Sequence, residues 1–177
     1  MIDADLKINN SIRMLREDDL DLILKWRNHE SIRSFMFNKE IIKRVDHVRW
    51  FESLATRKDK FAFIFTINEE IKGFAQISLA GNEIAEWGFY VDPYAQSGLG
   101  KYLAYNIIEY LFDEMNVRKI VGRVIDFNKR SISLHEKFGF TTEGVLRQEH
   151  FDDSTYHDVI CFGLLKNEWT GKGKQDE

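Results

Sequence analysis

The sequence predicts an α/β protein whose mixed sheet carries helices on both faces. Residues 86–91 alternate between core-type and outward-type side chains, which is the period of a strand with one buried face. From Leu99 to Met115, apolar residues recur at spacings of three and four, as in a helix of about four turns. Strand and helix patterns also alternate along the rest of the chain, and this order favours helices on both sides of a sheet.

The chain before residue 83 is expected to contain a strand, three helical segments and a β-hairpin. Asp18 and Asp46 are the expected N-caps of the first and third helical segments, because their carboxylates can accept from free N–H groups. A run rich in Phe and Ile, followed by Asn68-Glu69-Glu70 and a second strand-like run, predicts the hairpin. The expected ranges are 7–15 for the strand, a helix ending near 28, a helical piece at 31–37, a helix around 50–54, and 61–67 with 71–79 for the hairpin.

The second half of the chain is expected to continue the sheet. Pro93 is the only proline and has no N–H for a ladder, so the strand before it should end near Asp92. A modest apolar pattern follows residue 128, and Gly139 is well placed to stop a helix there. The expected strands are 119–125, 142–151 and 155–165, with a turn at 152–154.

Composition and length favour one globular domain, residues 1–170, with a loose tail at 171–177. The chain has 177 residues, of which 44% are hydrophobic, and a net charge of −4 that argues against a nucleic-acid partner. No apolar stretch approaches a membrane span, and the N-terminus lacks a signal-peptide core, so a cytoplasmic protein without a membrane partner is expected. The lone Cys161 lies in an apolar run and is expected to be a buried thiol rather than a nucleophile.

The turn before the long helix carries Gly98 and Gly100. The first N–H groups of such a helix lack partners within it and lie at the positive end of its dipole, so an anion fits there. The spacing matches neither the P-loop nor the dinucleotide pattern, and by itself it is also compatible with a plain turn.

Two stretches resemble motifs of the GNAT superfamily of N-acetyltransferases. Residues 85–101 are similar to its acetyl-CoA segment, in which Gly98 and Gly100 match while Ala95 replaces the usual Arg or Gln. Residues 128–140 are similar to its second motif, with His135 in the tyrosine position. The resemblance implies the GNAT fold, a mixed and mostly antiparallel central sheet flanked by helices, with a helix at 128–138. It also implies direct acetyl transfer from acetyl-CoA.

The resemblance assigns residues to the cofactor. Backbone amides of the turn are expected to hold the pyrophosphate, and one N–H of the preceding strand, where that strand bulges from its neighbour, is expected to face the thioester carbonyl. Asn128 and Ser131 lie on one helix face with His135, beside the expected pantetheine arm. The expected acetyl-CoA residues are Phe89, Tyr90, Val91, Ser97, Gly98, Leu99, Gly100, Lys101, Asn128 and Ser131.

Two residues are candidates for catalysis. His135 could protonate the leaving thiolate, could serve only as a hydrogen-bond donor, or could be an ordinary residue of a helix surface. Glu86 lies on the face opposite the core residues and is the candidate base for the amine, although a solvated strand carboxylate would fit the same pattern. The histidines have no metal-ligand spacing, so no metal is expected.

The acceptor residues follow from a resemblance to a GNAT subgroup that acetylates a UDP-linked 4-amino-4,6-dideoxy sugar in pseudaminic acid synthesis. A basic cluster of Arg27, Arg33, Lys43, Arg44 and Arg49 would suit such an anionic acceptor. Each aromatic residue of the region could instead be core, and Arg27 a solvated helix end. Two alternatives are a ribosomal-protein N-terminal alanine acetyltransferase and a non-catalytic CoA-sensing domain. Each of the three functions is compatible with a homodimer. The expected acceptor residues are Trp26, Arg27, Met36, Phe37, His47, Trp50 and Ser78.

Overall fold

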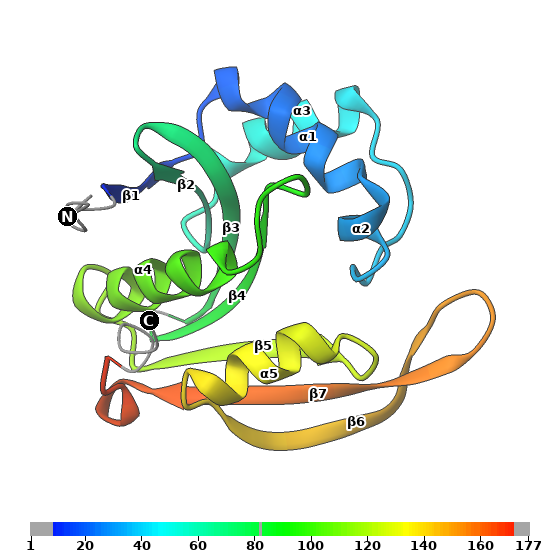
Figure 1. The fold of residues 1–177 in the computed structure, drawn as a ribbon, viewed down its shortest axis with the longest axis vertical. Helices are drawn as coiled ribbons and strands as arrows, with labels where there is room; N and C mark the ends of the chain where they lie inside the picture. Colours follow the sequence, from blue (N-terminus) through cyan, green and yellow to red (C-terminus); the bar gives the residue numbers. More distant parts are fainter. Residues whose placement is uncertain (1–8, 82, 172–177) are drawn as a thin grey trace, which may run out of the picture.

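The computed structural model describes residues 9–81 and 83–171. These residues form one seven-stranded sheet in the order β1-β2-β3-β4-β5-β7-β6, with helices on both faces (Figure 1). The strands are β1 (Asn10–Met14), β2 (Lys60–Ile67), β3 (Glu70–Ala80), β4 (Ile84–Val91), β5 (Lys119–Ile125), β6 (Thr141–Phe151) and β7 (Tyr156–Leu165). The helices are η1 (Glu17–Asp19), α1 (Leu20–Asn28), α2 (Glu30–Arg33), α3 (Arg44–Leu54), α4 (Leu99–Asp113), α5 (Lys129–Lys137) and η2 (Lys166–Glu168).

The sheet is antiparallel at every pairing except β4 with β5. β2 and β3 form the expected hairpin, and its turn residues Asn68 and Glu69 have positive φ angles. β4 ends at Val91, two residues before Pro93, as the missing N–H of proline requires. The predicted fold class is therefore confirmed.

Two hydrophobic clusters cover the two faces of the sheet. The larger one packs α4 and the residues after α5 against β2, β3, β4, β5 and β7, with Leu103, Ile107 and Phe112 fully buried. The smaller one packs α1, α2 and α3 against the other face of β2 and β3. Figure 1 shows the two groups of helices on either side of the sheet. The face below α1 to α3 is the one on which the acceptor is expected.

The expected helix starts of the N-terminal half need correction. A short 3-10 helix precedes α1, and Asp19, not Asp18, accepts the main-chain N–H of Arg16 at 2.8 Å. Arg13 also binds Asp19 through both terminal nitrogens, at 2.7 and 2.8 Å, so this carboxylate ties β1 to α1. α3 begins at Arg44, before the expected cap Asp46, and α2 ends at residue 33 rather than 37.

The C-terminal half agrees more closely with expectation. β5 spans the expected residues 119–125, α5 spans 129–137, and Gly139 after it has a φ of 83°. Residues 7–8 of the expected first strand and residues 172–177 of the expected tail lie outside the described residues. Within the described ranges, no helix is long and apolar enough to cross a membrane.

Candidate active site

The two parallel strands at the middle of the sheet pair for only three residues. Ile84, Ala85 and Glu86 of β4 lie opposite residues 119–121 of β5, and beyond Glu86 and Val121 the strands diverge (Figure 1). β4 continues to Val91 against β3 alone, and β5 continues to Ile125 against β7. We call the point of divergence the fork.

The fork leaves main-chain groups of β4 without a neighbouring strand. Main-chain N–H groups alternate between the two edges of a strand. The N–H of Asp92 donates to the carbonyl of Lys72 on the β3 side, so the N–H groups of Phe89 and Val91 point to the diverging side and that of Tyr90 points to β3. The β3–β4 register has no shift over this length, so β4 stays paired with β3 while it leaves β5. Phe89 and Val91 therefore have the orientation that an oxyanion donor requires.

The turn after β4 presents a bare helix start. Gly98 is the N-cap of α4 with φ 110°, a conformation that residues with a Cβ rarely adopt, and no side chain caps the helix. The first turn of α4 has no acidic residue, so the positive end of its dipole is not neutralised there. A Cβ on Gly100 would lie 3.7 Å from Leu134 and 4.0 Å from Phe89, so this helix start lies where β4 and α5 meet. These residues could hold a diphosphate.

His135 lies inside the core and not on a helix surface. Its side chain is 3% exposed, its ring stacks on Phe162 at 4.8 Å, and burial lowers its pKa although a main-chain hydrogen bond to Ser131 opposes this. Nδ1 lies 2.8 Å from the carbonyl oxygen of Ser131, and Nε2 accepts the indole N–H of Trp87 at 3.1 Å. Nδ1 therefore carries the proton, and the ring is neutral. Both nitrogens are engaged, so His135 has no proton to give to a bound thiolate in this arrangement.

Asn128 and Ser131 build the start of α5. The Oδ1 of Asn128 accepts the N–H of Ser131 at 3.1 Å as an N-cap, and the carbonyl of Ser131 in turn accepts from His135. The three residues share one side of the helix, as expected. In the described part of the chain, the side chain of Asn128 bonds only to the N–H of Ser131, so a contact of Asn128 or Ser131 with a cofactor remains a prediction.

Glu86 stands at the fork on the face below α1 to α3. Its cross-strand partner in β3 is Ser78, and its side chain is exposed. Side chains two apart on a strand share a face, so Gly88 and Tyr90 follow Glu86 along the same row. A Cβ on Gly88 would meet no atom within 4 Å. The candidate base therefore borders open space on the acceptor side.

Arg27 and Tyr90 lie beside each other at the far end of that row. Arg27 donates from Nη2 to the carbonyl of Asn38 at 2.7 Å, whereas its Nη1 is buried without a hydrogen-bond partner among the described residues. Burial lowers the pKa of Arg27, an effect that Tyr90 opposes and the nearby Arg33 reinforces. Burial also raises the pKa of Tyr90, although the charge of Arg27 works in the other direction. An anion reaching Nη1 would pair with this guanidinium.

The other expected acceptor residues divide into core and surface. Trp26 is 3% exposed within the smaller cluster, so it has little surface to offer a ligand. Trp50 packs on Phe74, and His47 stacks on Trp50 at 5.1 Å. Burial lowers the pKa of His47, and its Nε2 is a second buried polar atom without a partner among the described residues. Met36 is half-buried against the same cluster, and Phe37 is 49% exposed.

The sequence did not indicate the contacts of the segment that lies against Arg27. The segment between α2 and α3, residues 34–43, spans from α1 to the ends of β5 and β7. Lys39 lies 3.6 Å from Asp152 and over the ring of Phe127, and Phe37 meets the ring of His150 at 5.6 Å. His157 joins Asp152 to Asp126, at 3.0 and 3.2 Å. These residues lie far apart in the sequence, so no spacing could have indicated the contact.

The comparisons with known proteins identify the family of this chain. The family model for an acetyltransferase (GNAT) domain matches residues 12–161. The chain belongs to the GNAT family of acetyltransferases. Acetyltransferase PseH of Campylobacter jejuni (strain 81-176) is 30% identical over 127 residues, 72% of this chain and 80% of the relative. The prophage-derived N-acetyltransferase YokL of Bacillus subtilis is 28% identical over 165 residues, 91% of this chain and 92% of the relative.

A solved structure extends the likeness of this GNAT protein to the whole fold. The spermidine N-acetyltransferase of Vibrio cholerae, in complex with CoA and spermine, superposes with a TM-score of 0.84 over 90% of this chain and 96% of that chain. This superposition shows that the two proteins share a fold, although their sequences are only 22% identical. Together with the family match, this makes the protein a GNAT N-acetyltransferase.

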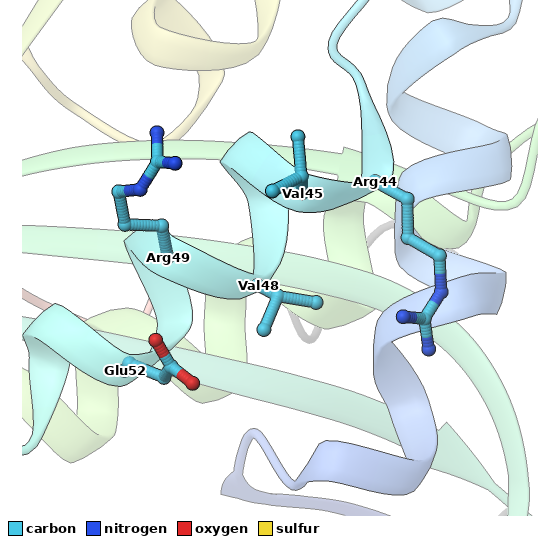
Figure 2. Close-up of a pocket in the computed structure, with 5 residues that line it drawn as sticks. All are labelled: Arg44, Val45, Val48, Arg49 and Glu52. Carbon is cyan, nitrogen blue, oxygen red and sulfur yellow. The ribbon is translucent and has the colours of Figure 1, made fainter.

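One pocket of this GNAT domain lies away from the predicted site. Figure 2 shows it on the outer side of α3, where Arg44, Val45, Val48, Arg49 and Glu52 line it. Arg44 pairs with Asp21 at 2.8 Å and Arg49 with Asp46 at 3.1 Å, and all four side chains are largely exposed. The expected basic cluster is therefore divided: Arg44 and Arg49 are paired with carboxylates at the surface, whereas Arg27 is half-buried and its Nη1 is covered.

Proposed function

We propose that this GNAT enzyme acetylates the 4-amino group of a UDP-linked 4-amino-4,6-dideoxy sugar, directly from acetyl-CoA. Such a reaction belongs to pseudaminic acid synthesis, which supplies sugars for flagellin glycosylation. The observation that carries the proposal is the buried Nη1 of Arg27, which has no hydrogen-bond partner among residues 9–81 and 83–171, with Arg33 beside it. A buried N–H donor without an acceptor is costly, and a diphosphate or uracil oxygen would supply an acceptor for Nη1.

The same observation bears on the polyamine alternative. Spermidine is a cation, and a site that places Arg27 and Arg33 together would repel it. The similarity to spermidine N-acetyltransferase keeps polyamines as the second candidate. Two observations support the sugar: the 30% identity to Acetyltransferase PseH, and the resemblance of the segments around Arg27 and Trp50 to the subgroup that acetylates a UDP-linked amino sugar.

The reaction has a simple proton balance at the fork. The acceptor amine gives a proton to the carboxylate of Glu86 and forms a bond from nitrogen to the thioester carbonyl carbon. The N–H groups of Phe89 and Val91 donate to the oxyanion that develops there. The carbon–sulfur bond then breaks, and the CoA thiolate takes its proton from water because His135 has none to give, while Glu86 releases the proton of the amine to the solvent. The start of α4 holds the cofactor diphosphate.

The test offers the purified protein acetyl-CoA with three amines in turn: the UDP-linked 4-amino sugar, spermidine, and a peptide with N-terminal alanine. Thiol release and product mass are followed together. The expected result is one acetyl group on the sugar and a kcat/KM for the sugar at least tenfold above the other two. Preferential acetylation of spermidine or of the peptide would contradict the proposed acceptor. Binding of acetyl-CoA without transfer to any amine would favour the sensing role.

A pair of variants separates the Arg27 site from general surface charge. Arg27→Met keeps the aliphatic stem and removes the charge, and loss of a charge-assisted pair of about 1.5–3 kcal/mol predicts a rise of roughly 10–100-fold in KM for the sugar. Arg44→Met removes an exposed, already paired arginine and should leave that KM within twofold. Equal effects of both variants would mean that Arg27 does not bind the acceptor.

A further inference from the structure

Four neighbouring positions of β3 and β4 form one patch on the acceptor face of the sheet. The register places Ser78 opposite Glu86 and Gln76 opposite Gly88. Side chains of directly opposed residues, and of residues two apart on one strand, point to the same face. Glu86 and Gly88 are exposed and Ser78 and Gln76 half-buried, whereas Ile77 between the last two faces the opposite side and is fully buried.

The Gly88 corner of this patch is empty. A Cβ at Gly88 would meet no atom within 4 Å. The strand glycines Gly73, Gly122 and Gly163 differ, because a Cβ on each would overlap a neighbouring side chain. Gly88 also has no positive φ, so neither packing nor backbone conformation requires a glycine there. A glycine within a strand lowers stability, and one retained in open space can serve the close approach of a ligand.

We propose that Gln76, Ser78 and Glu86 surround a seat for the acceptor ring, with Gly88 as its floor. The three side chains offer an amide, a hydroxyl and a carboxylate, which suit a ring that carries hydroxyl and acylamino groups as well as the reacting amine. The seat adjoins the fork, where the N–H groups of Phe89 and Val91 point to the diverging side. Gln76 is then a specificity-determining residue that binds a ring substituent. This inference rests on the acetyl transfer of the proposed function and deepens its acceptor class.

Filling the empty corner tests the seat. Gly88→Val should fold at least as well as the wild type, because the added side chain enters open space and valine favours strands. The expected result is an unchanged or higher Tm, a Kd for acetyl-CoA within twofold, and a fall of at least 100-fold in kcat/KM for the acceptor. Gly144→Val is the matched control, since Gly144 lies in β6 and a Cβ there also meets nothing within 4 Å.

Gln76 is tested by its effect on acceptor choice. Gln76→Leu keeps the size of the side chain and removes both hydrogen-bonding groups. We expect its KM to rise at least tenfold for an amino sugar, while the KM for a simple alkylamine changes less than twofold. A change in kcat alone, or an equal change for both acceptors, would overturn the assigned role of Gln76.

The outcomes separate the seat from the proposed sugar. The measurements use whichever amine of the panel reacts fastest, so acetylation of spermidine would refute the sugar and still allow Gly88→Val to be tested. A kcat/KM within threefold of the wild type in Gly88→Val would overturn the seat and leave the acetylated substrate as found. Transfer to no amine at all would overturn both.

Discussion

The indole N–H of Trp87 on β4 donates to Nε2 of His135 on α5 at 3.1 Å, and this contact lies within the larger core. The carbonyl of Ser131 fixes the proton on Nδ1 of the same ring. The residue in the tyrosine position of the second GNAT motif is thereby a buried acceptor that connects β4 to α5 just beyond the fork. We infer that His135 positions Trp87 on β4. Two residues later on the same strand, the N–H of Phe89 points to the side where β4 and β5 diverge.

Replacing His135 should affect stability far more than turnover. His135→Ala leaves a cavity and an unpaired indole N–H, which together predict a loss of about 2–5 kcal/mol in unfolding free energy. His135→Gln keeps an acceptor and should lose less. Urea unfolding followed by tryptophan fluorescence measures both. The kcat of folded His135→Gln should stay within a few-fold of the wild type; a fall of about 100-fold or more would instead indicate an acid catalyst.

Stability should decline on mild acidification because of two buried histidines. Burial lowers the pKa of His135 and of His47 below the ordinary value of about 6.5. Below that value the unfolded chain binds protons that the folded chain does not, so the unfolding free energy falls as the pH drops. Urea unfolding from pH 8 to pH 5 should show this slope, at most about 1.4 kcal/mol per pH unit for each histidine. His135→Gln should reduce the slope, and an unchanged slope would contradict the assignment.

A substitution at Gly122 on β5 would disturb the contact between Trp87 and His135. A Cβ there would overlap Nε2 of His135 and lie 3.0 Å from Nε1 of Trp87. Gly122→Ala should therefore cost about 1–3 kcal/mol as an overpacked core substitution. Differential scanning calorimetry would record it as a lower Tm. Gly144→Ala, at a strand position with open space, should leave Tm nearly unchanged.

Alanine substitutions at Gly98 and Gly81, two glycines with positive φ, distinguish the effect of backbone strain from an effect on cofactor binding. Gly98→Ala and Gly81→Ala each force a Cβ onto a positive φ in open space, so each should lose about 1–2 kcal/mol of stability. Gly98 alone lies at the start of α4, so its variant should also bind acetyl-CoA more weakly by calorimetric titration. Equal affinity in both variants would argue against the diphosphate position.

The sequence predicts elements well where local pattern and packing agree. α4 is amphipathic along its length and β5 is rich in Ile and Val, so β5 has the predicted bounds and α4 ends two residues before the predicted Met115. The starts of α1 and α3 were mispredicted because Asp18 and Asp46 have the chemistry of a cap, while the chain uses Asp19 and the extended backbone of Lys43.

The candidate site was harder to predict because its contacts join distant segments. Spacing placed His135 on a helix face with Asn128, but only the folded chain brings Trp87 and Phe162 against that face and buries it. Trp26 has the composition of a ligand platform and lies in the core. Lys39 and Asp152 are 113 positions apart, and no local pattern indicates their contact.

The three-residue pairing of β4 with β5 has a consequence for the lifetime of the protein in the cell. Few main-chain hydrogen bonds join the two parts of the sheet, so local opening should begin at the fork. Acetyl-CoA bound between the strands would contact both parts, and at 100 times its Kd it would stabilise the folded chain by about 2.7 kcal/mol. Proteases that cleave opened chains would then remove the enzyme faster when the supply of its acetyl donor falls.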